Sequence, residues 1–382
     1  MADNKSILAP KIRFKGYAHA WEQRKFNSIV KKISTQSNAD YLPKIEFEDI
    51  ISGEGRLNKD ISNKFDRRKG TSFEANNILY GKLRPYLKNW LFADFKGIAL
   101  GDFWVFEANN SSSIFDYYLI QNEKYQEAAN LSTGTKMPRS DWETVSETIF
   151  SIPTNIYEQT AIGTFFRTLD DTITLHQRKL DGLKELKQGY LQQMFPQAGE
   201  CVPRVRFAGF DAVWKARKIE DFTDVGTGSK DTQDAITNGV YDFYVRSPNI
   251  EKINSYSFDG EAVLTVGDGV GVGKVFHYVN GKFDYHQRVY KISNFNGVHG
   301  LFFYQYFAMN FIKESQKYNA KTSVDSVRRD MITKMLIPCP TLEEQISIGN
   351  FIKNLDEQIA THQLKLEKLK QLKSAYLQKM FV

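Results

Sequence analysis

The residues best suited to contact a nucleic acid lie in two separate stretches of the sequence. Arginine can bind guanine through two hydrogen bonds, asparagine or glutamine can bind adenine in the same way, and lysine, serine and threonine suit phosphates. Each residue alone is most simply explained as a solvated surface side chain, so the prediction rests on the clusters. The candidates in the first stretch are Arg67, Arg68, Lys69, Lys82, Arg84, Tyr86, Lys88, Thr133, Lys136 and Arg139. Those in the second are Lys230, Arg246, Ser247, Asn249, Lys274, Gln287, Arg288, Asn319, Lys321, Arg328 and Arg329.

The glycine-rich segment 267–274 looks at first like a phosphate-binding loop. The Walker pattern fails, because Asp268 replaces its first glycine and Val275 follows Lys274. The dinucleotide-binding pattern fails as well, because Lys274 replaces its last glycine. We therefore predict a hairpin with a close backbone approach, in which Lys274 could still contact a DNA phosphate.

No complete catalytic site is visible in the sequence. We find no metalloprotease H-E-x-x-H, no nucleophile elbow, no kinase motif set and no Asn-Pro-Pro-aromatic motif of an adenine methyltransferase. His176 and His362 could form a paired metal or proton site, but no Cys, Asp or Glu with ligand spacing accompanies them. We therefore favour histidines hydrogen-bonded between helices, and we predict no catalytic residue and no metal site.

The composition is that of a folded, soluble protein that can accept a polyanionic partner. The chain has 382 residues, enough for two or three domains, and 41% of them are hydrophobic, which excludes a disordered chain. The formal net charge of +6 permits a nucleic-acid partner without proving one. Two cysteines, Cys201 and Cys339, exclude a disulfide scaffold. With no signal peptide and no long apolar run, we expect a cytoplasmic protein without membrane contact.

An internal repeat organises the elements that must position these residues. The opening segment 10–25 recurs at 203–218, and Glu158-Gln159 recurs as Glu344-Gln345 at the start of a longer repeated block. That block ends Tyr-Leu-Gln-Gln-Met-Phe in the first copy and Tyr-Leu-Gln-Lys-Met-Phe in the second. The residues between the repeated blocks are only faintly similar. The sequence therefore predicts a duplicated unit with two diverged heads.

Each repeated block has the periodicity of a long helix. Apolar residues recur at spacings of three and four, which is typical of a coiled-coil seam, and a helix of about 40 residues is roughly 60 Å long. The seam must pair with another helix, but its periodicity leaves parallel and antiparallel pairing open. Lys187 and Lys373 also occupy seam positions, where a long stem can reach solvent or a polar group can set the register. The residues predicted to pair the helices are Leu169, Ile173, His176, Leu180, Leu183, Tyr190, Leu355, Ile359, His362, Leu366, Leu369 and Tyr376.

The variable regions contain patterns of short strands, turns and a few helices. Strand patterns cover residues 98–106, 262–266 and 288–292, and helical patterns cover residues 114–129 and 301–315. The sequence thus predicts an α+β protein with two mixed α/β heads, each followed by a long α-helix. We place the first head at 1–155 and its helix at 156–198. The second head is placed at 199–342 and its helix at 343–382.

This plan resembles the specificity subunit of type I restriction–modification systems over essentially the whole chain. The resemblance rests on the duplicated openings and the duplicated helix blocks. The segment Leu83-Arg84-Pro85-Tyr86-Leu87 is also similar to a turn common in the recognition domains of that family. The second head has the glycine-rich hairpin in place of that turn.

The resemblance implies two target-recognition domains, each reading one half of a bipartite, asymmetric sequence in double-stranded DNA. It implies that the two helices pair as an antiparallel coiled coil with pseudo-twofold symmetry, set the spacer and dock two methyltransferase subunits. It also implies that this chain is not catalytic. The methyltransferase subunits would use S-adenosylmethionine, and the motor–nuclease subunits would use ATP and Mg, so no cofactor is expected in this chain.

Three alternatives remain open at this level. The partner could be a fused restriction–methylation polypeptide rather than separate subunits. The chain could itself be an enzyme, a reading that S-adenosylmethionine binding by the isolated chain would support. It could also be a coiled-coil adaptor that joins two protein ligands, in which case its affinity for DNA need not depend on salt.

Overall fold

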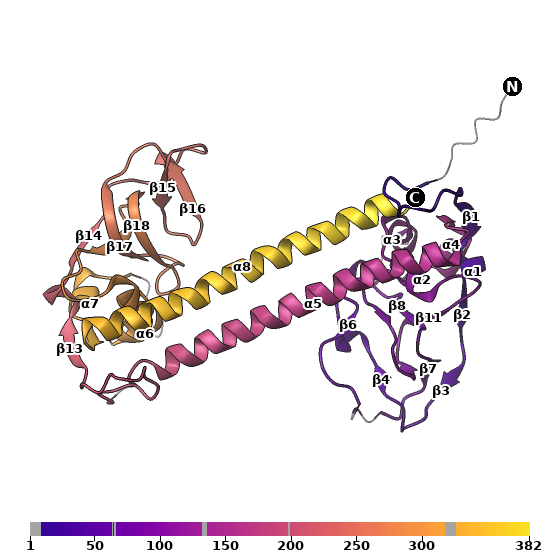
Figure 1. Ribbon diagram of the computed structural model, residues 1–382, viewed down its shortest axis with the longest axis horizontal. Helices are drawn as coiled ribbons and strands as arrows, with labels where there is room; N and C mark the ends of the chain where they lie inside the picture. The colour runs from indigo at the N-terminus through magenta and orange to yellow at the C-terminus, as the bar shows by residue number, and fades with distance from the viewer. Residues whose placement is uncertain (1–8, 63, 65, 132–135, 198, 318–325) are drawn as a thin grey trace. The chain divides into compact units, whose positions relative to one another are not determined.

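The computed structural model describes residues 9–62, 64, 66–131, 136–197, 199–317 and 326–382 (Figure 1). The chain divides into two compact units. The first contains Met1–Arg178 together with Leu364–Val382, and the second contains Lys179–Gln363. Each unit therefore holds one head and a part of each of the two long helices.

The first unit is built from short strands in two four-stranded sheets. One sheet has the order β2-β11-β8-β9, and the other has the order β3-β7-β10-β4. A separate antiparallel pair, β1 with β12, joins the opening of the head to its end, and β5 and β6 form a small hairpin. The strands are β1 (Glu22–Lys25), β2 (Val30–Ile33), β3 (Gln36–Ser37), β4 (Lys44–Ile45), β5 (Ile50–Ile51), β6 (Arg56–Leu57), β7 (Gly70–Phe73), β8 (Ile78–Gly81), β9 (Trp90–Phe92), β10 (Gly97–Ala99), β11 (Phe103–Ala108) and β12 (Ile149–Ile152).

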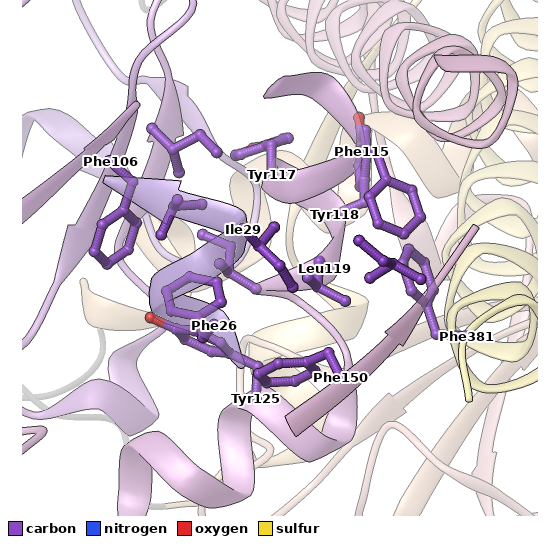
Figure 2. Close-up of a cluster of buried hydrophobic side chains, with 14 of the residues drawn as sticks. Phe26, Ile29, Phe106, Phe115, Tyr117, Tyr118, Leu119, Tyr125, Phe150 and Phe381 are labelled. Carbon is purple, nitrogen blue, oxygen red and sulfur yellow. The ribbon is translucent and has the colours of Figure 1, made fainter. Parts of the chain in front are cut away.

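The core of the first unit is rich in aromatic rings (Figure 2). Phe26 lies at its centre, with ring centroids 5.3 Å from Phe106 and 5.1 Å from Tyr125, both in edge-on contacts that aromatic pairs prefer. Phe381, near the end of the chain, joins this core at 5.4 Å from Phe115. The short helices around it are α1 (Phe26–Ile29), α2 (Ser113–Leu119), α3 (Glu123–Asn130) and α4 (Trp142–Glu147).

Two patterns of the first head are interrupted where the sequence predicted continuity. The strand predicted at 98–106 is two strands, because Gly101 adopts a positive φ of 82° between β10 and β11. The helix predicted at 114–129 is α2 followed by α3. Asn122 caps α3 by accepting a hydrogen bond from the Tyr125 N–H, so a new helix begins there.

The second unit contains one larger, six-stranded sheet with the order β14-β19-β17-β18-β15-β16. Its longest pairing is the antiparallel hairpin of β17 and β18, and β15 adds to β18 in parallel. The pair β13 with β20 corresponds to the β1–β12 pair of the first unit. The strands are β13 (Lys215–Lys218), β14 (Asp224–Thr227), β15 (Tyr241–Tyr244), β16 (Ile250–Ile253), β17 (Phe258–Val266), β18 (Phe276–Tyr285), β19 (Val289–Ser293) and β20 (Leu336–Cys339).

The core of the second unit forms around α6 (Gly300–Gln316), with α7 (Arg329–Thr333) beside it. Phe303, Phe307 and Phe311 on α6 are fully buried and follow each other at four-residue spacing, the spacing that places side chains on one helix face. The hairpin predicted at the glycine-rich segment is confirmed. It connects β17 to β18, and a side chain at Gly271 would collide with the backbone carbonyl of Arg246.

The two long helices are α5 (Ile156–Gln193) and α8 (Leu342–Met380), drawn in magenta and yellow in Figure 1. In the first unit, Phe165 on α5 packs edge-on against Tyr376 on α8, with centroids 5.1 Å apart. Further along α5, Asp170 is 2.7 Å from the Nζ of Lys373. Residue numbers rise on one helix as they fall on the other, so the two segments run antiparallel in this unit.

The second unit repeats these contacts with the roles of the helices exchanged. Tyr190 on α5 packs edge-on against Phe351 on α8 at 4.8 Å, and the Nζ of Lys187 is 2.5 Å from Asp356. Tyr190 and Lys187 occupy the positions of the first block that Tyr376 and Lys373 occupy in the second. The segments again run antiparallel, a direction that the periodicity alone left open.

Candidate nucleic-acid interface

The first head is anchored to α5 by the repeated Glu-Gln pair. Glu158 is buried and accepts two hydrogen bonds from Arg13, at 2.5 and 2.8 Å, and one from the Trp21 indole at 3.3 Å. Gln159 accepts a hydrogen bond from the N–H of Ser112, at the start of α2, at 2.8 Å. A two-point arginine–carboxylate pair fixes orientation as well as distance, so α5 holds both the opening and the helical part of this head.

The second head uses the same device on α8. Arg206 donates two hydrogen bonds to the buried Glu344, at 2.6 and 2.7 Å. Gln345 accepts a hydrogen bond from the N–H of His299, which precedes α6, at 2.9 Å. The residues repeated in the sequence therefore anchor the heads, and the residues that differ between the copies form the remaining surface of each head.

The candidates of the first head meet at the end of β8. Lys82 follows that strand directly, and Arg84, Tyr86 and Lys88 lie exposed in the next turn. The N–H of Arg84 donates a hydrogen bond to the carbonyl of Pro138 at 2.7 Å, which brings the segment 136–140 beside this turn. Arg139 pairs across a β-bridge with the residue after Lys82.

The turn after β8 holds two basic residues in an unusual backbone conformation. Arg84 has φ 49° and Lys88 has φ 54°, both in the left-handed region that non-glycine residues rarely adopt. Such strain persists only where the surroundings enforce it, and it occurs often at binding sites. It presents the two basic side chains on either side of the short 3₁₀ turn Pro85–Leu87.

The basic residues before β7 are less available than those after β8. Arg68 is paired with Asp66 at 2.5 Å and with Glu46 at 2.8 Å. The hydrogen bond from Arg68 lowers the pKa of the Asp66 carboxyl to about 2, so that group stays charged and compensates the arginine. Arg67, Lys69 and Lys136 are exposed. Thr133 lies outside the described residues.

The candidates of the second head also meet at one end of a sheet. The N–H of Gln287 donates a hydrogen bond to the carbonyl of Lys230 at 2.8 Å, and Arg288 precedes β19. Arg246 follows β15 closely, and Lys274 is exposed on the hairpin between β17 and β18. Backbone pairing thus places Lys230 beside Gln287, and Arg246 and Arg288 share the carboxylate of Asp268.

The other candidates of the second head differ in their surroundings. Arg329 donates a hydrogen bond to the carbonyl of Val225 at 3.2 Å, which ties α7 to β14. Arg328 is exposed, and Ser247 donates a hydrogen bond to the carbonyl of Asn249 at 3.3 Å. Asn319 and Lys321 lie outside the described residues.

Sequence reasoning missed two acidic residues within these clusters. Asp102 is 3.6 Å from the Nζ of Lys82 and 3.1 Å from a guanidinium nitrogen of Arg139. Asp268 is 3.4 Å from Arg246 and 3.5 Å from Arg288. A signal for them exists, because each directly follows a glycine, Gly101 within the strand pattern 98–106 and Gly267 just after the pattern 262–266.

Sequence reasoning also missed a buried histidine beneath the second cluster. The Nδ1 of His286 accepts a hydrogen bond from the Arg288 N–H at 2.9 Å, and the imidazole is 2% exposed. Burial lowers the pKa of His286, so the ring is neutral at pH 7. It acts as a fixed acceptor that shapes the turn carrying Gln287 and Arg288.

The residues predicted to pair the helices are half-buried or buried. Ile173, Leu180, Leu183, Leu355 and Leu366 are buried. The half-buried ones are Leu169, His176, Tyr190, Ile359, His362, Leu369 and Tyr376. Within the described ranges, no group of three His, Cys, Asp or Glu residues could hold a metal ion. The described helices also include none that is long and apolar enough to cross a membrane.

The ion pair between the helices in the first unit also reaches the head. Lys373 contacts the Gln121 amide oxygen at 3.1 Å, and the Tyr118 hydroxyl donates to Asp170 at 2.8 Å. Burial raises the pKa of Asp170, although Lys373 opposes this effect. In the second unit, Gln305 on α6 donates to Asp356 at 3.4 Å. Each of these pairs therefore contacts the head beside it.

Comparison with known proteins agrees with this arrangement. The family model described as type I restriction modification DNA specificity domain matches residues 19–185 and again residues 212–371. The EcoDI specificity subunit of a type I restriction enzyme from Escherichia coli is 27% identical over 165 residues, which are 43% of this chain and 36% of that protein. The chain thus aligns with little more than a third of the length of that relative.

Two solved structures share the fold. The S subunit of a type I restriction–modification system from M. genitalium has a TM-score of 0.70 at 15% identity, covering 98% of this chain and 99% of that one. A structure reported for complex assembly and conformational transition of the type I R-M system has a TM-score of 0.50 at 16% identity, covering 94% and 97%. With the family model matching both copies of the repeat, the chain belongs to the family of type I restriction–modification DNA specificity domains.

Proposed function

We propose that this chain is the sequence-specific DNA-recognition subunit of a type I restriction–modification complex. Each head reads one half of a bipartite, asymmetric target in double-stranded DNA. The observation that carries the proposal is the pair of different basic clusters, after β8 and before β19, on heads held by the same Arg–Glu–Gln anchor. Because the two anchors are the same, each recognition surface is held in the same way on its own helix. Because the two surfaces differ, they read different half-sites.

The two helices act in this proposal as an antiparallel coiled coil with pseudo-twofold symmetry that sets the spacer. The exchanged ion pairs Lys187–Asp356 and Lys373–Asp170 support that symmetry, since each uses a lysine of one copy and an aspartate of the other. A helix of 38 residues is about 57 Å long, and one turn of DNA is about 34 Å. Helices of this length are sufficient to separate two heads by about one turn of DNA.

The helices also carry the surface we assign to the methyltransferase subunits. Leu186 on α5 and Leu372 on α8 occupy equivalent positions of the two blocks, and both are exposed. A surface that is repeated on the two helix blocks favours two copies of one partner over a single asymmetric one. The methyltransferase subunits supply S-adenosylmethionine chemistry on adenine, and motor–nuclease subunits supply the ATP- and Mg-dependent step. This chain contributes recognition without catalysis and acts in the cytoplasm.

Modified-base sequencing tests the proposal directly. DNA is compared from cells carrying this chain with its methyltransferase partner and from cells lacking only this chain. We expect a bipartite N6-methyladenine motif that appears only when the chain is present. With the partner expressed and bound, the absence of any such motif would contradict the proposal and favour a protein adaptor.

Exchange of single parts sharpens the same test. Replacing residues 1–155 with the head of another specificity subunit is expected to change one half of the motif and to leave the other half intact. A change in the length of the helix blocks is expected to alter only the spacer. A head exchange that altered both halves would contradict independent reading by the two heads.

A further inference from the structure

In both heads, one carboxylate lies between two basic side chains of the candidate interface. Asp102 uses one oxygen for Lys82 and the other for Arg139. Asp268 does the same for Arg246 and Arg288. In each case the three charged side chains come from three separate segments of the head, so the arrangement is not a local sequence effect.

The two arrangements occupy the same place in the fold with the charges inverted. Lys82 follows β8 and Asp102 precedes β11, and these strands pair with Gly81 opposite Phe103. Asp268 follows β17 and Arg288 precedes β19, and these strands pair with Val266 opposite Val289. At the end of the equivalent strand pair, the first head therefore has a basic residue after the first strand and an acidic residue before the second. The second head has an acidic residue after the first strand and a basic residue before the second.

The backbone around each acid is fixed more firmly than the side chains it contacts. The carbonyl of Asp102 accepts a hydrogen bond from the Lys82 N–H at 2.9 Å, and Asp268 forms a β-bridge with Ser326. Both carboxylates are less than a third exposed, whereas Arg139, Arg246 and Arg288 are each more than half exposed. The acids are therefore the fixed points to which the longer basic side chains are held.

Stability does not account for these acids. Ion pairs this exposed add little to folding free energy, because water screens the charges and the side chains lose freedom. An acid in a DNA interface also weakens phosphate binding. An acidic residue in this place is explained if it restricts the orientation of the basic side chains. Readout of the edges of DNA bases depends on that orientation, whereas attraction to phosphates does not.

We propose that Asp102 and Asp268 are positioning residues for sequence readout, each holding two basic side chains in the orientation that its half of the target requires. The inference rests on the proposed DNA-recognition function and deepens it. It assigns discrimination to acidic residues that do not themselves need to contact a base. Each acid acts on one half of the target only.

The test uses the full chain with its methyltransferase partner and the variants Asp268→Asn and Asp102→Asn. Binding is measured by competition between the cognate duplex, duplexes changed in one half, and unrelated duplex, over a range of salt concentrations. For Asp268→Asn we expect about a tenfold loss of discrimination in the second head's half-site. Affinity for unrelated DNA should rise, with a salt dependence steeper by up to about one unit, because a negative charge is gone and the arginines are released to phosphates. Asp102→Asn should do the same for the other half-site.

Two further variants separate positioning from general structure. Asp242→Asn removes an exposed acid paired with Lys252 at 2.7 Å elsewhere in the second head, and should leave discrimination unchanged. Arg246→Ala should relax the same half-site as Asp268→Asn, and combining the two should add less than the sum of the single effects. Unchanged discrimination in Asp268→Asn and Asp102→Asn, or equal relaxation of both half-sites, would overturn the inference. A wild-type chain without any sequence preference would instead contradict the proposed function.

Discussion

The two heads share their attachment and one strand order, β2-β11-β8-β9 in the first and β14-β19-β17-β18 in the second, and they differ in what is built around it. In each, an arginine near the opening of the head binds a buried glutamate on a long helix, and the following glutamine holds the start of a head helix. Beyond that point, the first head has two four-stranded sheets and the second has one six-stranded sheet. The difference teaches that this duplicated chain kept the parts that orient a head and changed the sheets that carry its candidate DNA-binding residues.

The heads also differ in the ionisable groups that they bury. The second head buries His286 and half-buries His277 and His299, and desolvation lowers the pKa of each. The first head buries Asp116, whose pKa burial raises to about 8. These groups therefore contribute to the pH dependence of stability in opposite directions in the two heads, although the heads are joined to the same pair of helices.

The largest expected difference concerns the anchors. Arg206→Ala leaves the fully buried Glu344 without its arginine, which costs about 3–5 kcal/mol when a buried ion pair is broken. Arg13→Ala should cost about 1 kcal/mol less, because Glu158 keeps the hydrogen bond from Trp21. Hydrogen exchange across each head of the full chain measures the loss. Arg206→Lys and Arg13→Lys are the matched controls, and equal losses from the two alanine variants would break the comparison.

The pH response is the next largest effect. A histidine with a lowered folded pKa stabilises the fold above its ordinary pKa, near 6.5, and that stability is lost as the pH falls below it. An aspartate with a raised pKa stabilises the fold below its ordinary pKa, near 4, and that stability is lost as the pH rises toward 8. From pH 7.5 to 5.5 these histidines should therefore reduce the stability of the second head, while Asp116 adds to the stability of the first.

The measurement is urea unfolding of the full chain at several pH values, read out by hydrogen exchange corrected for intrinsic rates. Asp116→Asn should reduce the gain in stability of the first head toward low pH and leave the pH dependence of the second unchanged. Parallel pH trends in the two heads would contradict the assignment of these buried groups.

A smaller difference is expected between the two ion pairs of the helices. Lys373→Ala removes contacts to Asp170 and to Gln121. Because Lys373 and Asp170 are both mostly buried, we expect a loss of about 1–3 kcal/mol in the free energy of unfolding. Lys187→Ala should cost less than about 1 kcal/mol, because Asp356 is more exposed. Urea unfolding followed by hydrogen exchange at the two helix segments compares them. An equal loss of stability at both sites would show that burial does not determine how much these ion pairs stabilise the protein.

The smallest expected effect contrasts two arginines of the first head. Arg84→Ala should weaken DNA binding by about 1 kcal/mol, since Arg84 is exposed in the turn after β8. Arg68→Ala should weaken it less, because Asp66 and Glu46 already compensate that charge. Affinity for cognate duplex at fixed salt distinguishes them. A larger effect from Arg68→Ala would show that DNA displaces Arg68 from its acidic partners.

Much of the framework could be predicted from residue types and spacing. The repeated openings and the seam of leucines and isoleucines predicted two long helices, and α5 and α8 confirm them. The failed Walker pattern at 267–274 correctly predicted a hairpin. Boundaries inside the heads were harder. Gly101 divides one predicted strand and Asn122 divides one predicted helix, because a single residue with turn or capping geometry outweighs the surrounding propensity.

The sequence by itself determined the duplication, the helical periodicity and the types of residue available to bind DNA. Only the tertiary structure decided which of those residues meet. It brought Asp102 between Lys82 and Arg139, compensated Arg68 with Glu46 and Asp66, and set the two helices antiparallel within each unit. Periodicity reports one helix at a time, whereas a charge interacts through space with whatever the fold places within a few ångströms. The direction of pairing and the state of each charge therefore depend on contacts between residues that are far apart in the sequence.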